Sequence, residues 1–297
     1  MIPRPAPSHR APGSFGSIDV MICSGLVGRS ILSSRSPWLH EQEARAQGLA
    51  LTYALFDFNE RGLADDALPA FLHDLAGQGF AGVNITYPFK QQVIPALDEL
   101  SQSAAFVGAV NTVAMRDGRL IGHNTDMEGF RDSLQHGLPT VRKDHVLLLG
   151  AGGAGSAVAS ALLSLDVGLL SICDADGPRA QALVASLATL FGPQRVAFMA
   201  REALATGTVD GLVNATPMGM AAHPGLPLAS ELILPTHWVA DIVYFPIETA
   251  FLKAARTKGC QTLDGSGMVI AQAARAFEII TNRKADQARM RRSFVAG

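Results

Sequence analysis

The stretch Val146-Leu-Leu-Leu-Gly-Ala-Gly-Gly-Ala-Gly155 decides the fold, because it joins an apolar strand to a turn with the pattern G-x-G-x-x-G. Gly150 permits the tight turn, Gly152 lets the backbone approach a pyrophosphate, and Gly155 lets the next helix pack close to the sheet. Residues 156–165 continue as that helix, whose amino end can hold a phosphate. The stretch therefore predicts the first βα unit of a dinucleotide-binding domain.

A second strand, predicted from Leu169 to Asp174, ends in an acidic side chain. Asp174 follows Gly155 by nineteen residues, a spacing at which a carboxylate accepts hydrogen bonds from the adenosine ribose. Its charge repels a 2′-phosphate, so NAD is favoured over NADP as the cofactor. A membrane span over residues 146–165 is excluded, because four glycines within six positions would break its helix and no aromatic or basic belt flanks it.

Composition describes a well-packed globular protein with room for two domains, since 48% of the 297 residues are hydrophobic and 17% are charged. The net charge of −2 provides no long-range attraction to nucleic acid or to a membrane surface. The three cysteines lie far apart and the histidines form no ligand motif, so we expect a reducing cytoplasmic location, no disulfides and no metal. A basic cluster is interpreted as the solvated face of a terminal helix: Arg283, Lys284, Arg289, Arg291 and Arg292.

Alternating apolar strands and helical segments predict an α/β fold with two domains. After a flexible tail at residues 1–17, a substrate-binding and catalytic domain with an open, mostly parallel sheet is expected over 18–126, completed by 270–297. A doubly wound Rossmann domain is expected over 127–269, with a cleft between the two. The expected strands are 20–27, 51–58, 82–86, 195–199, 211–214, 239–243 and 261–263; the expected helices are 37–48, 63–77, 91–100, 127–137 and 268–280.

Polar clusters at strand ends and loops precede the Rossmann unit, and they suit a small polyhydroxylated carboxylic acid. Hydroxyl groups of Ser34, Ser36 and Thr86 can bind a carboxylate, and the amide of Asn111 can bind ring alcohols. The small-molecule substrate is expected to be the partner of this site.

Oxidising an alcohol with NAD requires a group that takes the hydroxyl proton as hydride leaves carbon. Lys90, in a strand-to-helix loop after Tyr87-Pro-Phe, is the expected proton-transfer group. Asp126 would orient it and hold the hydroxyl. Taken singly, Lys90 is better explained as an exposed lysine at a helix start, and Asp126 as the N-cap of the helix that follows.

Successive motifs, in order from about residue 22 to the C-terminus, resemble those of the shikimate/quinate dehydrogenase family. They are Ser34-Arg-Ser-Pro, Asn84-Ile-Thr-Tyr-Pro-Phe-Lys90, Ala109-Val-Asn-Thr112, Asn124-Thr-Asp126, Gly150-Ala-Gly-Gly, Asn214-Ala-Thr-Pro and Asp264-Gly-Ser-Gly-Met-Val-Ile-Ala-Gln272. The resemblance implies reversible oxidation of the ring C3 hydroxyl of quinate and/or shikimate to 3-dehydroquinate or 3-dehydroshikimate. It implies catalytic roles for Lys90 and Asp126, and substrate contacts for Ser34, Ser36, Thr86, Lys90, Asn111, Asp126, Tyr244 and Gln272.

The resemblance also implies the cofactor contacts, which are Gly150, Ala151, Gly152, Gly153, Ala154, Gly155, Asp174, Arg179, Asn214, Ala215, Thr216, Met218, Gly267 and Met268. NADP-dependent shikimate enzymes of the family carry an Asn-Arg-Thr-like stretch after the second Rossmann strand. This chain has Asp174-Ala-Asp-Gly-Pro-Arg179, which resembles the NAD-dependent quinate/shikimate dehydrogenases. Ser30-Ile-Leu-Ser33 replaces the common Pro-Ile-x-His, and Ser36 is threonine in some quinate-preferring relatives, so both acids stay open as substrates.

Three alternatives remain. The first two are a biosynthetic NADP-dependent shikimate dehydrogenase and a related enzyme for an amino-substituted ring. The third is a catalytically inactive nucleotide-binding regulator that kept the fold, since a fold alone does not prove activity. The presence of both Lys90 and Asp126 argues against the regulator. A monomer and a homodimer are both compatible with the sequence.

Overall fold

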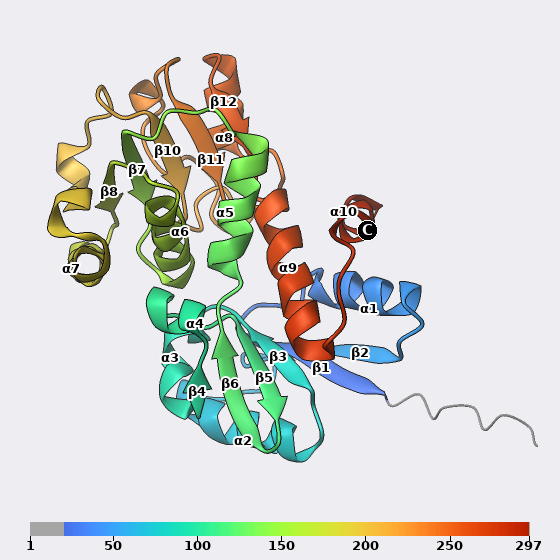
Figure 1. The fold of residues 1–297 in the computed structure, drawn as a ribbon. Helices are drawn as coiled ribbons and strands as arrows, with labels where there is room; N and C mark the ends of the chain where they lie inside the picture. Colours follow the sequence, from blue (N-terminus) through green and yellow to red (C-terminus); the bar gives the residue numbers. More distant parts are fainter. Residues whose placement is uncertain (1–20, 297) are drawn as a thin grey trace, which may run out of the picture.

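Two six-stranded sheets, one in each half of the chain, organise the computed structural model, which describes residues 21–296 (Figure 1). The first has the order β2-β1-β3-β5-β6-β4 and the second the order β12-β11-β10-β7-β8-β9. Counted from its own first strand, the second sheet has the order 3-2-1-4-5-6 of a doubly wound Rossmann domain. The two-domain α/β class is therefore confirmed. The tail predicted for residues 1–17 lies outside the described residues.

The first sheet is mixed rather than uniformly parallel. Its parallel strands are β1 (Ile22–Gly28), β2 (Leu51–Asp57) and β3 (Gly82–Ile85). An antiparallel hairpin of β5 (Thr112–Arg116) and β6 (Arg119–His123) continues the sheet, and the short β4 (Glu99–Leu100) pairs with β6. The sequence analysis missed this hairpin, although Asp117-Gly118, with φ of 51° and 75°, is a typical hairpin turn.

Helices cover this sheet. They are α1 (Ser36–Ala46), α2 (Leu68–Gly77), α3 (Phe89–Gln92) and α4 (Gln102–Val107), with single 3-10 turns at Asp65–Ala67 and Ile94–Ala96. Helices α1 and α2 lie close to predicted helices, and α4 was not predicted. The helix predicted over 91–100 is wrong, because α3 ends at Gln92 and the chain then makes a 3-10 turn and β4. Pro95 explains the break, since it lacks the N–H that a continuing helix needs.

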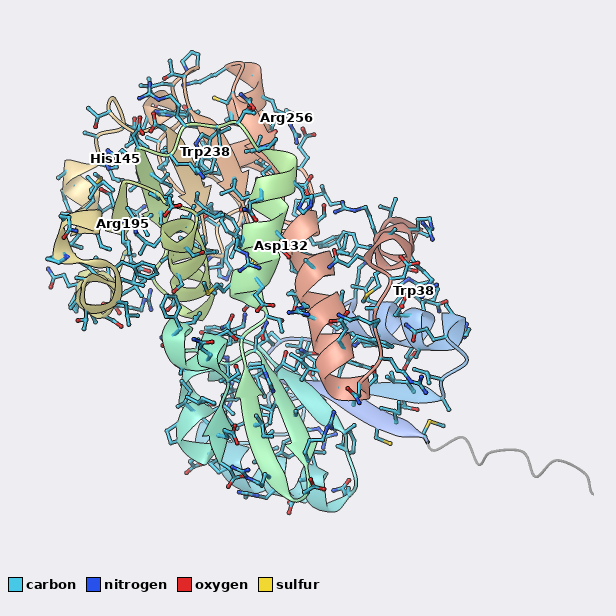
Figure 2. All side chains as sticks on the ribbon, in the orientation of Figure 1. Trp38, Asp132, His145, Arg195, Trp238 and Arg256 are labelled. Carbon is cyan, nitrogen blue, oxygen red and sulfur yellow. The ribbon has the colours of Figure 1, made fainter. Side chains whose placement is uncertain are left out.

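The Rossmann sheet is parallel throughout. Its strands are β7 (His145–Leu149), β8 (Leu169–Cys173), β9 (Val196–Phe198), β10 (Gly211–Asn214), β11 (Trp238–Asp241) and β12 (Gln261–Leu263). Its helices are α6 (Gly153–Ser164), α7 (Gly177–Phe191) and α8 (Ala250–Thr257), with 3-10 turns at Pro193–Arg195, Arg201–Ala203 and Ser230–Leu232. Side chains fill the space between sheet and helices, where Trp238 packs over Gly211 and donates to the Arg142 carbonyl at 2.8 Å (Figure 2).

Two long helices, α5 (Asp126–Gly137) and α9 (Ser266–Thr281), run side by side between the sheets (Figure 1). They approach closely because both carry glycine at the contact. A Cβ added at Gly129 would lie 2.9 Å from the Met268 carbonyl oxygen, and one at Gly267 would collide with the Ser133 hydroxyl. The far end of α9 packs against β3 and β5 of the first sheet. These helices therefore set how the two sheets sit relative to each other.

The C-terminal helix α10 (Gln287–Ala296) docks on α1, which corrects the interpretation of the basic cluster as wholly solvated. Arg289 donates from Nε and Nη2 to Glu43 at 2.7 Å each, and the Glu43 side chain is fully buried. Burial alone would raise the pKa of Glu43, but hydrogen bonds from Arg289, the Asp286 N–H and Gln47 hold it below its usual value. Within residues 21–296, no helix is long and apolar enough to cross a membrane.

Candidate active site

Lys90 and Asp126 meet in space although 36 positions separate them in sequence. The Lys90 Nζ donates to Asp126 Oδ2 at 2.6 Å, and the two side chains are only 18% and 7% exposed. Lys90 lies on α3 directly after β3, and Asp126 is the first residue of α5. Asn124 Oδ1 accepts from the backbone N–H groups of Asp126 and Met127 at 3.1 Å each. Because Asn124 satisfies the helix end, the Asp126 carboxylate is left to bind Lys90.

The glycine-rich turn lies against this ion pair. A Cβ added at Gly153 would be 3.1 Å from the Lys90 Cβ. Gly150 has φ of +107°, and a Cβ at Gly155 would collide with the Gly150 carbonyl oxygen, whereas a Cβ at Gly152 would meet nothing within 4 Å. This combination of a tight turn, close helix packing and one open backbone face fits the pyrophosphate of a dinucleotide. Lys90, which follows a strand of the first sheet, therefore packs against the glycine-rich turn of the Rossmann domain.

Two of the three hydroxyls predicted to bind a carboxylate, those of Ser34 and Ser36, lie at the start of α1. Ser34 Oγ donates to Ser36 Oγ at 3.2 Å and accepts from the Ser36 N–H at the same distance. Behind them, the hydroxyl of Tyr53 contacts Ser36 and donates to Asn84 Oδ1 at 2.7 Å. Burial raises the pKa of Tyr53 well above its usual value, so this phenol stays neutral. Thr86 lies between β3 and Lys90.

Sequence reasoning missed Tyr53 and assigned no role to Asn84. The available signal was a tyrosine in a buried strand, whose hydroxyl must find a hydrogen-bond partner. Asn84 Nδ2 in turn donates a hydrogen bond to Thr112 Oγ1 at 2.9 Å. These residues form a buried polar layer beneath the candidate site.

Asn111 belongs to the same layer, and its amide is already engaged. Its Nδ2 donates to Thr125 Oγ1 and its Oδ1 accepts from the Thr125 N–H, both at 2.9 Å. The residue is 3% exposed. Asn111 therefore holds the loop that precedes Asp126. This structural role was not predicted from the sequence, which predicted only a substrate contact.

Tyr244 and Gln272 approach the same centre from the second half of the chain. The Tyr244 residue is 36% exposed, yet burial of its hydroxyl and, to a smaller extent, the charge of Asp126 raise its pKa. The Gln272 carbonyl on α9 accepts from Thr125 Oγ1 at 3.1 Å. Two residues distant in sequence are thus brought to the segment that carries Asp126.

Asp174 lies beside the glycine turn and forms an ion pair that the sequence analysis did not predict. Its Oδ2 accepts from the Ala151 N–H at 2.6 Å, and its Oδ1 accepts from the Asp176 N–H at 2.8 Å and from Arg179 Nη2 at 2.6 Å. Burial would raise the pKa of Asp174, but Arg179 and the two backbone donors hold it below its usual value. The Arg179 side chain is 48% exposed, so its guanidinium also faces solvent.

The loop after β10 closes the other side of the turn. A Cβ at Gly150 would lie 2.7 Å from the Ala215 carbonyl oxygen. Asn214 Oδ1 accepts from the N–H and hydroxyl of Thr216, and its Nδ2 donates to the Met218 carbonyl at 2.9 Å. Gly267 and Met268 mainly serve the packing of α9 on α5, where Met268 is 6% exposed.

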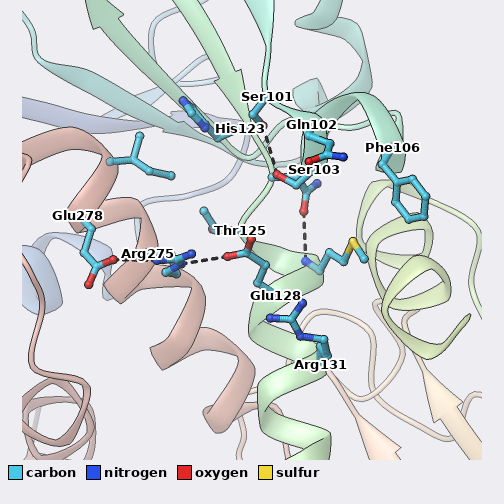
Figure 3. A pocket seen from close by; sticks show the side chains of 13 residues that line it. Ser101, Gln102, Ser103, Phe106, His123, Thr125, Glu128, Arg131, Arg275 and Glu278 are labelled. Carbon is cyan, nitrogen blue, oxygen red and sulfur yellow. Dashed lines mark hydrogen bonds and ion pairs between the residues drawn. The ribbon is translucent and has the colours of Figure 1, made fainter. Parts of the chain in front are cut away.

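A separate open cavity of about 530 Å³ lies between α4, α5 and α9 (Figure 3). Neither Lys90 nor Asp126 lines it. Three of its charged side chains bind one another, since Arg275 donates to Glu128 at 2.9 Å and to Glu278 at 3.0 Å. The cavity is therefore distinct from the site that the chemistry singles out.

The chain is similar to known proteins of one family. A family model described as the shikimate dehydrogenase substrate binding domain matches residues 26–113, and one described as the shikimate 5'-dehydrogenase C-terminal domain matches residues 265–293. The chain is 50% identical to a shikimate dehydrogenase (NADP(+)) of Pseudarthrobacter chlorophenolicus, over 91% of this chain and 93% of that protein. It is 46% identical to a quinate/shikimate dehydrogenase (NAD(+)) of Corynebacterium efficiens, over 93% of this chain and 98% of that protein.

Solved structures show the same likeness. Quinate dehydrogenase from Corynebacterium glutamicum in complex with NAD superposes with a TM-score of 0.85 at 42% identity, covering 93% of this chain and 99% of that one. Shikimate 5-dehydrogenase from Thermus thermophilus, in complex with NADP(H) and shikimate, superposes with a TM-score of 0.79 at 32% identity, covering 93% and 99%.

Proposed function

Because the chain belongs to the shikimate dehydrogenase family, a family of nicotinamide-dependent oxidoreductases, we propose that it reversibly oxidises the ring C3 hydroxyl of quinate and/or shikimate with NAD. The products would be 3-dehydroquinate and 3-dehydroshikimate. One observation carries the proposal: Lys90 binds the Asp126 carboxylate and its side chain lies against Gly153, where the glycine-rich turn enters α6. A proton-transfer group is thus placed where a ring alcohol and a nicotinamide can meet.

The ion pair handles the proton in this scheme. When bound, NAD supplies the acceptor for the hydride that leaves the ring carbon. In the oxidation direction Lys90 Nζ takes the hydroxyl proton as the carbon–oxygen double bond forms, while the proton that it shares with Asp126 moves to the carboxylate; in the reverse direction both transfers run backwards. Low exposure of both side chains strengthens their interaction with the substrate oxygen, because little water competes.

Hydroxyl groups would hold the substrate carboxylate at the other end of the ring. Ser34 and Ser36 lie together at the start of α1, and Thr86 precedes Lys90 on the loop after β3. Tyr244 would add a hydroxyl beside Asp126. This arrangement supports a substrate that carries a carboxylate and ring alcohols on one small scaffold.

NAD is proposed as the preferred cofactor because a carboxylate, Asp174, ends the second Rossmann strand. Relatives of similar identity are named for NADP and for NAD. NADP-dependent oxidation of shikimate is therefore the competing function, and the same assay measures it. Initial rates with each acid and each cofactor rank the four combinations.

Substitution of Lys90 tests the catalytic assignment. Lys90→Ala should lower kcat by about 10²- to 10⁴-fold, the usual contribution of general acid–base catalysis. The rate is followed by the absorbance of reduced cofactor with quinate or shikimate. Lys253→Ala, on the exposed face of α8, is the matched control and should keep the wild-type rate. A Lys90→Ala enzyme with undiminished turnover would refute the assignment.

A further inference from the structure

Asp241, at the end of β11, is a buried carboxylate without a cation. The residue is 2% exposed, and it takes part in no ion pair within residues 21–296. Its Oδ1 accepts from Asn214 Nδ2 at 2.9 Å and from the Val243 N–H at 3.0 Å, and its Oδ2 accepts from Thr249 Oγ1 at 2.7 Å. Fully buried carboxylates are rare unless they are paired with a cation or a metal. The group therefore needs an explanation other than packing.

Holding this charge inside the protein costs stability. Burial raises the pKa of Asp241 from 3.8 to about 6, although its three hydrogen bonds act in the opposite direction. Because the folded pKa lies above the unfolded one, the stability contributed by this group is fully present below the unfolded pKa. It is lost as the pH rises through about 6. At neutral pH the protein thus keeps an ionised group that weakens the fold.

The ionised carboxylate of Asp241 can only accept hydrogen bonds, so each neighbouring group that binds it must donate. It turns the NH₂ group of Asn214 toward itself, which leaves Asn214 Oδ1 to accept from the Thr216 N–H at 3.0 Å and from the Thr216 hydroxyl. The second N–H of Asn214 reaches the Met218 carbonyl, and Thr216 Oγ1 accepts from the Met218 N–H at 3.2 Å. The Asp241 carboxylate therefore supplies an acceptor for the same orientation of the Asn214 amide that the Thr216 N–H and the Met218 carbonyl require, and it joins this loop to the end of β11.

The same carboxylate holds a second turn and a helix end. Its bond from the Val243 N–H fixes the chain one residue before Tyr244. The Thr249 hydroxyl donates to Asp241 and so keeps its lone pairs for the Leu252 N–H, at 3.2 Å, which caps α8. An amide or a neutral acid at position 241 carries a donor on one of these two atoms, so it would lose either the bond from the Thr249 hydroxyl or those from Asn214 and Val243.

We propose that Asp241 is a positioning residue whose ionised carboxylate orients both the Asn214–Met218 loop and the turn before Tyr244. It thereby couples the dinucleotide contact to the ring-acid contact. This inference rests on the proposed function, in which that loop meets the dinucleotide and Tyr244 meets the substrate.

Among the residues that the structure describes, the other charged side chains near Asp241 do not contact its carboxylate, so the pH dependence expected here belongs to Asp241 itself. Its direct contacts, Asn214 from β10 and Thr249 before α8, are uncharged. The charged side chains beside and on α8, Glu248, Lys253 and Arg256, are exposed to solvent. Asp264, after the neighbouring β12, accepts instead from the Ser266 N–H at 2.9 Å.

The test compares Asp241→Asn with wild type and with Asp210→Asn, which removes a charge from the opposite end of the same sheet. Asp210 accepts from the His145 N–H at 3.0 Å, far along the strands from the glycine turn. Binding of NAD is measured by calorimetry and the KM for each ring acid by steady-state kinetics. At about pH 8, Asp241→Asn should weaken NAD binding by about tenfold, the scale of one charged hydrogen bond. It should also raise the ring-acid KM, and Asp210→Asn should change neither.

Two further readouts separate positioning from a purely structural role. Asp241→Asn should melt no lower than wild type at about pH 8, because it removes a buried charge. The ratio of the two NAD affinities should fall toward one as the pH drops through about 6, since wild type then loses its own charge. Thr249→Ser should retain the wild-type constants, whereas Thr249→Val should share the defect.

Unchanged NAD binding in Asp241→Asn at about pH 8 would overturn the inference. A joint loss of binding and melting temperature, with a ratio that does not depend on pH, would also overturn it in favour of a structural role. If wild type oxidises neither acid but binds NAD, the proposed function fails, and the affinity ratio still decides the role of Asp241. If wild type binds neither dinucleotide, both proposals are overturned.

Discussion

The carboxylate of Asp174 is shared among three donors of the protein itself, and this changes how it would select a cofactor. Two are backbone N–H groups, of Ala151 and Asp176, and the third is the guanidinium of Arg179. Its charge repels a 2′-phosphate, and its pairing also keeps Arg179 from binding one. Both effects favour NAD, and both depend on the same side chain.

Replacing Asp174 by alanine should therefore raise the ratio of kcat/KM for NADP to that for NAD by about tenfold or more, since like-charge contacts cost several kcal/mol. Part of the gain should come from the released Arg179. The double variant Asp174→Ala with Arg179→Ala should consequently gain less. Steady-state kinetics with both cofactors measure the ratios, and Asp176→Ala, which removes a more exposed carboxylate nearby, serves as control. An unchanged ratio in Asp174→Ala would contradict this role.

The β7–α6 turn shows how two glycines of one motif serve different purposes. At Gly155 an added Cβ would collide with the Gly150 carbonyl oxygen, which is backbone and cannot rotate away. At Gly152 an added Cβ would meet nothing within 4 Å, and φ is −74°, which any residue adopts. The first glycine is required by the fold, and the second leaves room for a ligand.

Gly155→Ala should thus lower the free energy of unfolding by about 1–3 kcal/mol, the usual cost of overpacking. Gly152→Ala should melt like wild type but bind NAD about tenfold more weakly, because its Cβ enters the space expected for the pyrophosphate. Thermal denaturation and calorimetric NAD titration measure the two effects. Equal melting temperatures for both variants would refute the structural role of Gly155, and full NAD affinity in Gly152→Ala would refute the ligand-binding role of Gly152.

At the scale of the whole molecule, the contact between α5 and α9 determines where Asp126 lies relative to Lys90. Asp126 begins α5, and Gly129 follows one turn later against the backbone of α9. A Cβ there would lie 2.9 Å from the Met268 carbonyl oxygen and 3.1 Å from the Gln272 nitrogen. Any substitution must push α5 away from α9, and this shift would move Asp126 relative to Lys90.

Gly129→Ala should accordingly lower the free energy of unfolding by about 1–3 kcal/mol and reduce kcat, because Asp126 moves with its helix. Gly77→Ala is the matched control, since it also lies in a helix but its Cβ would meet nothing within 4 Å. It should melt at or slightly above the wild-type temperature, as alanine is the better helix former. Melting curves and turnover with a ring acid measure both variants. A Gly129→Ala enzyme as active and stable as Gly77→Ala would mean that the helix contact is not tight.

The amino-acid sequence was enough to predict the Rossmann unit, its glycine turn, the acidic end of β8 and most of the strands, because these depend on periodicity and turn chemistry among neighbouring residues. It also identified Lys90 and Asp126 as candidates. Where local signals conflicted or were overlooked, as at Pro95 and Asp117-Gly118, the prediction of elements was wrong or incomplete.

Which side chains contact one another became visible only in the folded molecule. The contact of Lys90 with Asp126, the burial of Glu43 by Arg289, the engagement of the Asn111 amide and the uncompensated charge of Asp241 all join segments from different elements. Such contacts follow from strand order and helix packing, which depend on the whole chain at once. No local pattern carries that information, because a side chain's neighbours in sequence do not determine its neighbours in space.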